Sequence, residues 1–203
     1  MGRKIGRVGW TVALTLFLAG CATTKLTLVW MDEAYRDHRL DNVLVMGVSD
    51  RITMRRVFES KFVTQLKAAG IRAVSSAAVI PGEDKLSREA IEPEIKKLGI
   101  DAVLITHLVA VDRETVYYPP RTYIVPHAHH YYRHYYMVYD YVYEPGYYST
   151  YKTVRLETNI FDTKTGQPIW SAQSESLDPR SAEKLMDSLI GLVISDLRQK
   201  GLL

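Results

Sequence analysis

Two apolar runs separated by a helical pattern constrain the fold of this 203-residue chain more than any other feature. Residues 42–50 read NVLVMGVSD, an apolar run that ends in Gly, Ser and Asp, and residues 101–111 read DAVLITHLVAV. Runs with so little polar alternation are typical of strands that are buried on both faces in the centre of a sheet. The sequence therefore predicts a sheet that carries helices on its faces.

Amphipathic segments supply the helices. Residues 53–69 place apolar side chains three or four positions apart, which predicts a helix with one buried face. Asp50 and Thr53 are its N-cap candidates, and Gly70 follows where a left-handed residue ends a helix. Residues 87–98 predict a second helix.

The spacing of the first-half elements indicates parallel pairing. Residues 26–31 and 72–79 predict two further strands, so that strands and helices alternate along the first half. This alternation is typical of βαβ crossovers. In the second half, residues 152–161 alternate apolar and polar side chains, and a turn from Asp162 to Gly166 leads to a strand around Trp170. That pattern predicts an antiparallel hairpin.

A third helix closes the chain. Asp178 and Pro179 predict its N-cap and first turn, and the apolar periodicity continues to Lys200. The expected fold class is α+β or α/β: a mixed β-sheet with about three helices packed on it. We expect a βαβ first half and antiparallel hairpins in the second half.

The amino terminus indicates export. Arg3, Lys4 and Arg7 precede an uncharged stretch over residues 8–20, and this layout is that of a secretory signal peptide. The apolar stretch reaches about 20 Å as a helix, which is too short for a hydrocarbon core of about 30 Å. We expect residues 1–20 to be removed, residues 21–25 to form a lipidated tether and residues 26–203 to form a single globular domain.

The end of the leader resembles the bacterial lipobox. It reads Leu18-Ala19-Gly20-Cys21, and Cys21 is the only cysteine in the chain. The resemblance implies that Cys21 is the first mature residue and carries diacylglycerol and an N-acyl chain such as palmitate. Long acyl chains contribute about 0.8 kcal/mol per buried CH₂, so the anchor is expected to be stable.

The residue after the lipidated cysteine indicates which of the two bacterial membranes holds the protein. Ala22, in place of an aspartate, favours the outer membrane over the inner one by analogy with lipoprotein sorting in Gram-negative bacteria. We expect the inner leaflet and a domain that faces the periplasm.

The charge balance argues against nucleic acid as a partner. The three cations of the leader account for the formal net charge of +3, so the mature chain is formally neutral. The expected partners are instead the membrane, through the lipid anchor, and an envelope protein or glycan.

A family resemblance rests on several of these features. The lipobox, the Trp30-Met31-Asp32 strand end, the βαβ half, the Asp162–Trp170 segment DTKTGQPIW and the closing helix resemble a family of small proteobacterial outer-membrane lipoproteins of unknown function. The architecture is also loosely similar to the curli-secretion lipoprotein and to periplasmic modules of the Tol system. The resemblance implies a location and a fold but no activity.

The window of residues 117–151 holds 13 of the 14 tyrosines and four of the six histidines. One hypothesis is an aromatic hairpin or loop that recognises a partner, because tyrosine gives a large contact area at low entropic cost. Alternating residues of one strand would expose the phenols on one face. The candidate partner-binding residues are Tyr135, Tyr139, Tyr141 and Tyr143.

Two alternatives remain for this window. The tyrosines could instead pack against one another in a two-stranded extension with no partner. A metal-binding envelope protein is the other alternative, because imidazole binds Zn²⁺, Cu²⁺ and Ni²⁺. Prolines interrupt the window, so we expect residues 119–134 to be irregular. The candidate metal ligands are His127, His129, His130 and His134.

The sequence gives no sign of an enzyme. It contains no G-x-S-x-G, P-loop or G-x-G-x-x-G motif, and Cys21 is expected to carry lipid. His107, in the apolar run 101–111, is expected to be a hydrogen-bonded core residue. We expect a non-catalytic binding or structural module without a cofactor other than the Cys21 lipid, and an envelope hydrolase is the remote alternative.

Overall fold

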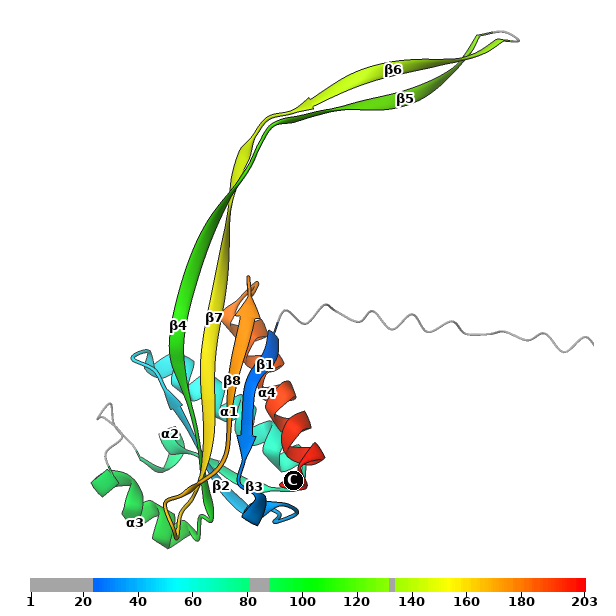
Figure 1. The fold of residues 1–203 in the computed structure, drawn as a ribbon. Coiled ribbons are helices and arrows are strands. Elements are labelled where there is room, and N and C mark those ends of the chain that lie inside the picture. Colours follow the sequence, from blue (N-terminus) through cyan, green and yellow to red (C-terminus); the bar gives the residue numbers. More distant parts are fainter. Residues whose placement is uncertain (1–23, 81–87, 132–133) are drawn as a thin grey trace, which may run out of the picture.

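Figure 1 shows the fold, a computed structural model that describes residues 24–80, 88–131 and 134–203. Only the backbone is described for residue 88 and, in the hairpin, for residues 127–131 and 134–138. The leader, Cys21 and most of the tether lie outside the described residues. In chain order the elements are β1 (Thr24–Met31), η1 (Glu33–Tyr35), β2 (Asn42–Val48), α1 (Ile52–Ala68), β3 (Arg72–Ser75), α2 (Ser76–Val79), α3 (Arg88–Leu98), β4 (Ala102–Tyr118), β5 (Arg121–Tyr131), β6 (His134–Glu144), β7 (Tyr147–Asp162), β8 (Pro168–Leu177) and α4 (Ala182–Gln199).

The main sheet is mixed, as the sequence predicts. Its six strands follow the order β1-β8-β7-β4-β2-β3. β2 pairs in parallel with β3 and β4, whereas β4, β7, β8 and β1 pair in antiparallel fashion. The apolar runs at residues 42–48 and 101–111 therefore occupy neighbouring central strands, and the expected fold class is confirmed.

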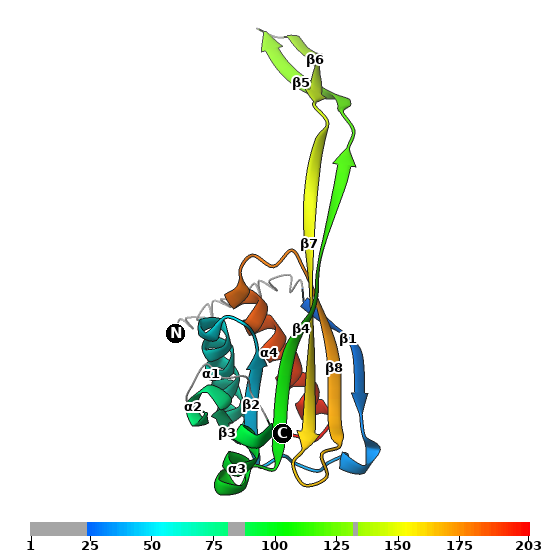
Figure 2. The same cartoon turned by 90° about the vertical axis from the view of Figure 1, so that its left-hand side faces the viewer.

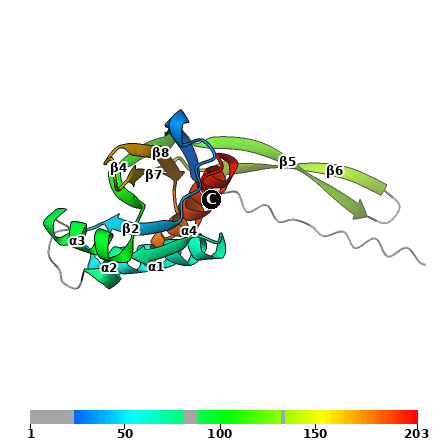
Figure 3. The ribbon, with the colours of Figure 1, turned by 90° about the horizontal axis from the view of Figure 1, so that it is seen from below.

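The larger core lies between one face of the sheet and helices α1 and α4. In the view of Figure 3 both helices lie on the same side of the strands. Phe62 and Leu66 of α1, Val193 and Leu197 of α4, and Trp170 of β8 are all fully buried there. The Trp170 indole donates a hydrogen bond of 2.8 Å to Asp196, which ties β8 to α4.

The opposite face of the sheet is only partly covered. A smaller cluster over β2, β3 and β4 includes Leu44, Met46 and Val103, with Ile91 and Ile95 of α3 packed against it. The same face of β1 is exposed, and its Trp30 side chain keeps 50% of its surface accessible.

The helix boundaries correct two predicted caps. Arg51, rather than Asp50 or Thr53, precedes α1, and its side chain makes no cap hydrogen bond. Ser181, rather than Asp178, caps α4, because its side chain accepts from the backbone N–H of Lys184. Asp178 has a φ of 46° and belongs to the turn after β8, so the helix starts later than the Asp-Pro pair indicates.

A short helix replaces part of a predicted strand. Residues 72–75 form β3, but residues 76–79 turn into α2 instead of continuing the strand. The turn brings Ser76 and the backbone of Ala77 toward α1. The predicted turn between the last two strands is confirmed, because Asp162 accepts from the backbone N–H groups of Lys164 and Thr165.

A long two-stranded arm leaves the body. β2 ends opposite His107 of β4, and β8 ends opposite Thr153 of β7. Beyond Asp112, which lies opposite Thr153, β4 and β7 pair only with each other. We call residues 113–152 the arm: its proximal ribbon is formed by residues 113–118 and 147–152, and its distal ribbon by β5 and β6. Figures 1 and 2 show the arm standing clear of the helices, with a bend between the two ribbons.

The distal ribbon corrects the expectation of an irregular tip. β5 and β6 pair in regular antiparallel register from Arg121 opposite Glu144 to Tyr131 opposite His134. Proline is tolerated at the edge of a ribbon, where its missing N–H can face solvent. Pro126 lies within β5, which shows that a single proline did not end the strand.

Candidate functional site

The proximal ribbon is held together by side-chain pairs across its two strands. Thr115 and Thr150 share a hydrogen bond of 3.0 Å. The rings of Tyr117 and Tyr148 have centroids 4.8 Å apart, and those of Tyr118 and Tyr147 stack at 5.0 Å. Such cross-strand pairs are the unit of stabilisation in a ribbon. They leave the tyrosines at least partly exposed, so they do not form a buried core.

A phenol pair adds a polar contact to the same ribbon. The Oη atoms of Tyr118 and Tyr151 lie 2.9 Å apart. This hydrogen bond raises the pKa of Tyr118 and lowers the pKa of Tyr151, which also has a hydrogen bond with Ser149. Either hydroxyl can donate in this pair, and the contact fixes the two rings relative to each other.

The bend between the ribbons has a steric basis. Pro119 and Pro120 connect β4 to β5, and Pro145 and Gly146 connect β6 to β7. A Cβ added to Gly146 would lie 2.6 Å from the Tyr117 Oη and 2.9 Å from the Pro120 Cδ. Glycine is therefore required where the two connections pass each other.

The two faces of the distal ribbon differ in chemistry. Residues directly opposite each other in an antiparallel pair share a face. Among residues 121–126 and 139–144, whose side chains the structure describes, one face carries by this register only uncharged side chains, and we call it the tyrosine face. It comprises Thr122 opposite Tyr143, Ile124 opposite Tyr141, and Pro126 opposite Tyr139.

The tyrosine face is open to solvent. Tyr139, Tyr141 and Tyr143 keep 60%, 75% and 65% of their surface accessible, and Ile124 keeps 52%. The opposite face carries the charges of the described part of the ribbon: Arg121 forms an ion pair of 2.6 Å with Glu144, and Asp140 lies opposite Val125. The hydrogen bond from Arg121 holds the pKa of Glu144 below its usual range.

The remaining candidate residues of the window are placed only by their backbone. Tyr135 lies in β6 opposite His130, and its side chain is outside the described residues. His127 and His129 lie opposite Val138 and Tyr136, and His134 lies opposite Tyr131. The register therefore places none of the four candidate metal ligands directly across from another, while their side chains are outside the described residues as well.

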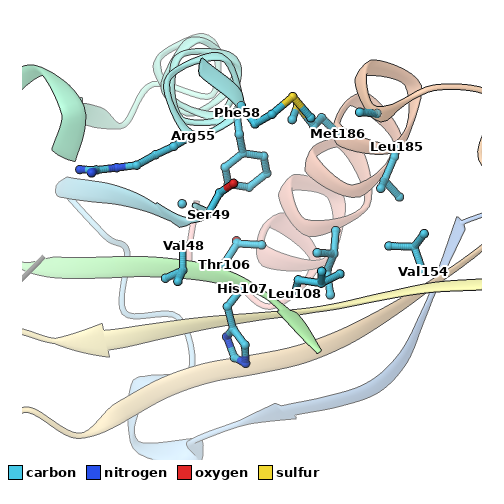
Figure 4. Close-up of a pocket in the computed structure, with 14 residues that line it drawn as sticks. Val48, Ser49, Arg55, Phe58, Thr106, His107, Leu108, Val154, Leu185 and Met186 are labelled. Atoms are coloured by element: carbon cyan, nitrogen blue, oxygen red, sulfur yellow. The ribbon is translucent and has the colours of Figure 1, made fainter. Parts of the chain in front are cut away.

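An apolar pocket lies between the first turns of α1 and α4. Its volume is about 200 Å³. Figure 4 shows Phe58 and Met186 approaching it from the two helices and Leu108 and Val154 from the sheet. Such a lining can hold an apolar group, but it brings no acid and base side chains together.

His107 corrects a sequence expectation. We expected a core histidine, but the side chain is only half-buried. Figure 4 shows its imidazole on the far side of β4 from Phe58 and Met186. The alternation of a strand explains this, because the neighbouring Thr106 occupies the core side, where it shares a buried hydrogen bond of 2.9 Å with Thr158.

A buried carboxylate beside the pocket was not anticipated from the sequence. Glu59 of α1 is fully buried and accepts from the Gly47 and Ala77 backbone N–H groups at 2.9 and 2.8 Å. It also accepts from the hydroxyls of Ser75 and Ser76 at 2.7 Å. The Arg55 Nε donates to it at 3.0 Å.

The environment of Glu59 points to a structural role. Burial raises the pKa of this carboxyl, but the hydrogen bonds from Gly47, Ser75, Ser76 and Ala77 outweigh it, so the pKa lies below its usual range. Every donor is fixed within the fold, and the residue links β2, α1 and α2. Only the i, i+4 spacing of Arg55 and Glu59 could have indicated the pair from the sequence.

Metal-binding groups and membrane-spanning helices are both absent from the part of the chain that the structure describes. The described residues hold no group of three or more histidine, cysteine, aspartate or glutamate side chains that could bind a metal ion. Within the same part of the chain, no helix is long and apolar enough to cross a membrane.

Comparisons with known proteins show similarity only to solved structures. No family model matches the chain, and no curated protein matches it. The PelC dodecamer from Paraburkholderia phytofirmans has 12% sequence identity and a TM-score of 0.46, covering 89% of this chain and 99% of that one. The lipoprotein GNA1162 from Neisseria meningitidis has 16% identity and a TM-score of 0.42, covering 78% and 99%.

Proposed function

We propose that the chain is a non-catalytic, lipid-anchored protein of the bacterial envelope that uses its arm as the interaction element. Acyl chains on Cys21 anchor the body in the inner leaflet of the outer membrane, and the body faces the periplasm. The observation that carries the proposal is the arm. It commits residues 113–152 to two ribbons whose described strands pair only with each other and with no strand of the body.

The physical reason is that a lone two-stranded ribbon is only marginally stable in water. The arm leaves large side chains accessible along both ribbons, from Tyr117 and Tyr148 to Tyr141. Exposed aromatic side chains gathered on one surface are typical of interaction sites. A contact that covers them stabilises the arm, whereas the body has its own core and does not need it.

The experiment is site-specific photocrosslinking in intact cells. A photoreactive amino acid replaces Tyr141 on the tyrosine face, and a matched variant carries it at Lys164, in the exposed turn before β8. We expect adducts from position 141 and none of the same products from position 164. Identical products from both positions, or no adduct from position 141, would contradict the proposal.

A deletion control separates the arm from the anchor. Residues 119–146 are replaced by Asn-Gly, which joins Tyr118 to Tyr147 through a two-residue hairpin turn. These two tyrosines already lie opposite each other, so the turn preserves the register. The shortened chain should stay in the membrane fraction with an intact body, while it loses the contacts of the distal ribbon.

A further inference from the structure

The start of β1 and the base of the arm lie at the same end of the body. Thr24 pairs with Ser176, Ser176 pairs with Val154, and Val154 pairs with Val111, so one row crosses four strands. The Thr24 and Ser176 hydroxyls share a buried hydrogen bond of 2.9 Å, which fixes the first residue of β1 in this row. Figure 1 shows β1 beginning at the end of the body from which the arm rises.

The chain between this row and the anchor is short. Cys21 precedes Thr24 by three residues, which span at most about 10 Å when fully extended. A lipid on Cys21, on which this inference rests, therefore keeps the bilayer surface close to the base of the arm. The body cannot move away from the membrane on a long tether.

The arm is much longer than the tether. From Arg113 to Tyr118 the proximal ribbon rises about 17 Å, and the eleven residues of β5 add roughly 33 Å beyond the bend. Because the arm leaves the body at its anchored end, it extends toward or along the bilayer. A bent arm of this length can therefore reach the lipid surface.

The distal ribbon has one face that suits such a contact. Lipid interfaces are enriched in tyrosine, whose ring is apolar while its hydroxyl remains hydrated. The tyrosine face presents Tyr139, Tyr141, Tyr143 and Ile124 without a charge, whereas the ion pair of Arg121 and Glu144 lies on the other face. One orientation thus leaves the charges in water.

From this geometry we infer that the tyrosine face of the distal ribbon rests on the surface of the bilayer that holds the Cys21 anchor. The inference identifies the lipid surface as the partner of the arm in the proposed function. A phospholipid surface satisfies both observations, because it lies within reach of the anchor and accepts an uncharged aromatic face. The arm then fixes the orientation of the body relative to the membrane.

The test uses the natural lipoprotein in vesicles of phosphatidylethanolamine and phosphatidylglycerol. Cys21 is the only cysteine, and lipid blocks its thiol, so one introduced cysteine is the single labelling site. An environment-sensitive fluorophore is attached at Ile124→Cys or Tyr141→Cys on the tyrosine face. The matched controls, Tyr123→Cys and Val142→Cys, are the adjacent residues on the charged face.

The expected result alternates along each strand. Vesicles should shift the fluorophore emission to shorter wavelength at positions 124 and 141 and leave positions 123 and 142 unchanged. Equal shifts at all four positions, or no shift at 124 and 141, would overturn the inference. A protein or glycan adduct at position 141 in the crosslinking experiment, without lipid, would overturn it as well while leaving the proposed function in place.

The wild-type protein distinguishes the two proposals. Without an introduced cysteine it should take up no fluorophore, because its one sulfur is a thioether. Labelled wild-type protein would reveal a free thiol at Cys21 and remove the anchor on which both proposals depend. If the wild-type protein takes up no fluorophore but the emission of the four labelled variants does not differ between the two faces, the membrane contact alone is refuted.

Discussion

Glu59 and the threonine pair hold polar groups in the core, and both depend on complete hydrogen bonding. Glu59 is fully buried and receives hydrogen bonds from β2, α1 and the β3–α2 turn. Thr106 and Thr158 bond to each other across β4 and β7. Buried polar groups stabilise a fold only when their partners are present, so single substitutions at these sites should be costly.

Glu59→Ala should destabilise the protein by about 3–5 kcal/mol at neutral pH, because it leaves Arg55 buried without its partner. The folded-state pKa of Glu59 lies below the unfolded value of about 4.3, so the wild-type contribution is present above that pH. It is lost as the pH falls through the folded-state pKa. The difference between wild type and variant should therefore shrink in acid.

Urea unfolding at neutral pH and at about pH 3.5 measures this difference. Glu94→Ala is the control, because Glu94 pairs with Lys97 on the surface of α3. A difference between wild type and Glu59→Ala that stays constant across this range would show that the carboxylate contributes no pH-dependent stability.

Thr106→Val and Thr158→Val should each cost about 1–3 kcal/mol, because each leaves the other hydroxyl buried without its partner. The double variant should be close to wild type, since two valines of similar shape leave no unsatisfied group. Chemical denaturation of the four proteins completes a double-mutant cycle. Strictly additive losses would mean that the hydrogen bond contributes nothing.

At the scale of the elements, the arm and the body are energetically separate. The body buries its apolar residues between the sheet and α1, α4 and α3. The arm beyond Thr153 relies on its own pairs, such as Tyr117 with Tyr148. Removing the arm should therefore leave the body intact, and substitutions in the arm should act on binding more than on folding.

Replacing residues 119–146 by Asn-Gly should leave the unfolding midpoint of the body nearly unchanged. The reason is that β8 and β2 end before the arm begins, so no strand of the body loses its partner. Thermal unfolding followed by circular dichroism measures the midpoint. A drop as large as that caused by Glu59→Ala would mean that the arm supports the core.

The histidines of the distal ribbon provide a test of the metal alternative. In the proposed function the arm binds its partner without a metal ion, so replacing His127, His129, His130 and His134 by alanine should leave the calorimetric titration with Zn²⁺ or Cu²⁺ unchanged. A titration that disappears in the variant, while far-UV circular dichroism stays the same, would instead support a metal site.

For the whole molecule, we propose that the position of the anchor relative to the arm sets the orientation of the body on the membrane. Thr24 lies in the row that ends at Val111, two residues before the arm begins. The same sheet therefore connects β1, which follows the expected lipid at Cys21, with the base of the arm. Loss of the anchor should release the protein without unfolding it.

Cys21→Ser should move the protein out of the membrane fraction, because the serine hydroxyl cannot form the thioether. Fractionation of cells and the intact mass of the mature protein measure the effect, and the heat stability of the body should not change. A variant that stays in the membrane with the wild-type mass at its amino terminus would contradict lipidation.

The sequence by itself determined the local elements. The apolar runs at residues 42–48 and 101–111, the periodicity of residues 53–69 and the turn from Asp162 to Gly166 all describe neighbours along the chain. Side-chain periodicity and turn chemistry act within a few residues, so they can be recognised without a structure.

Only the tertiary structure decided which distant groups meet. Gly47, Glu59 and Ser76 converge through three elements, and Ser181 rather than Asp178 caps α4. The regular pairing of β5 and β6 overcame the proline that favoured a loop. Strand order and register set these contacts, and they depend on packing across the whole chain. For the same reason, only the folded sheet puts the first residue of β1 at the same end of the body as the base of the arm.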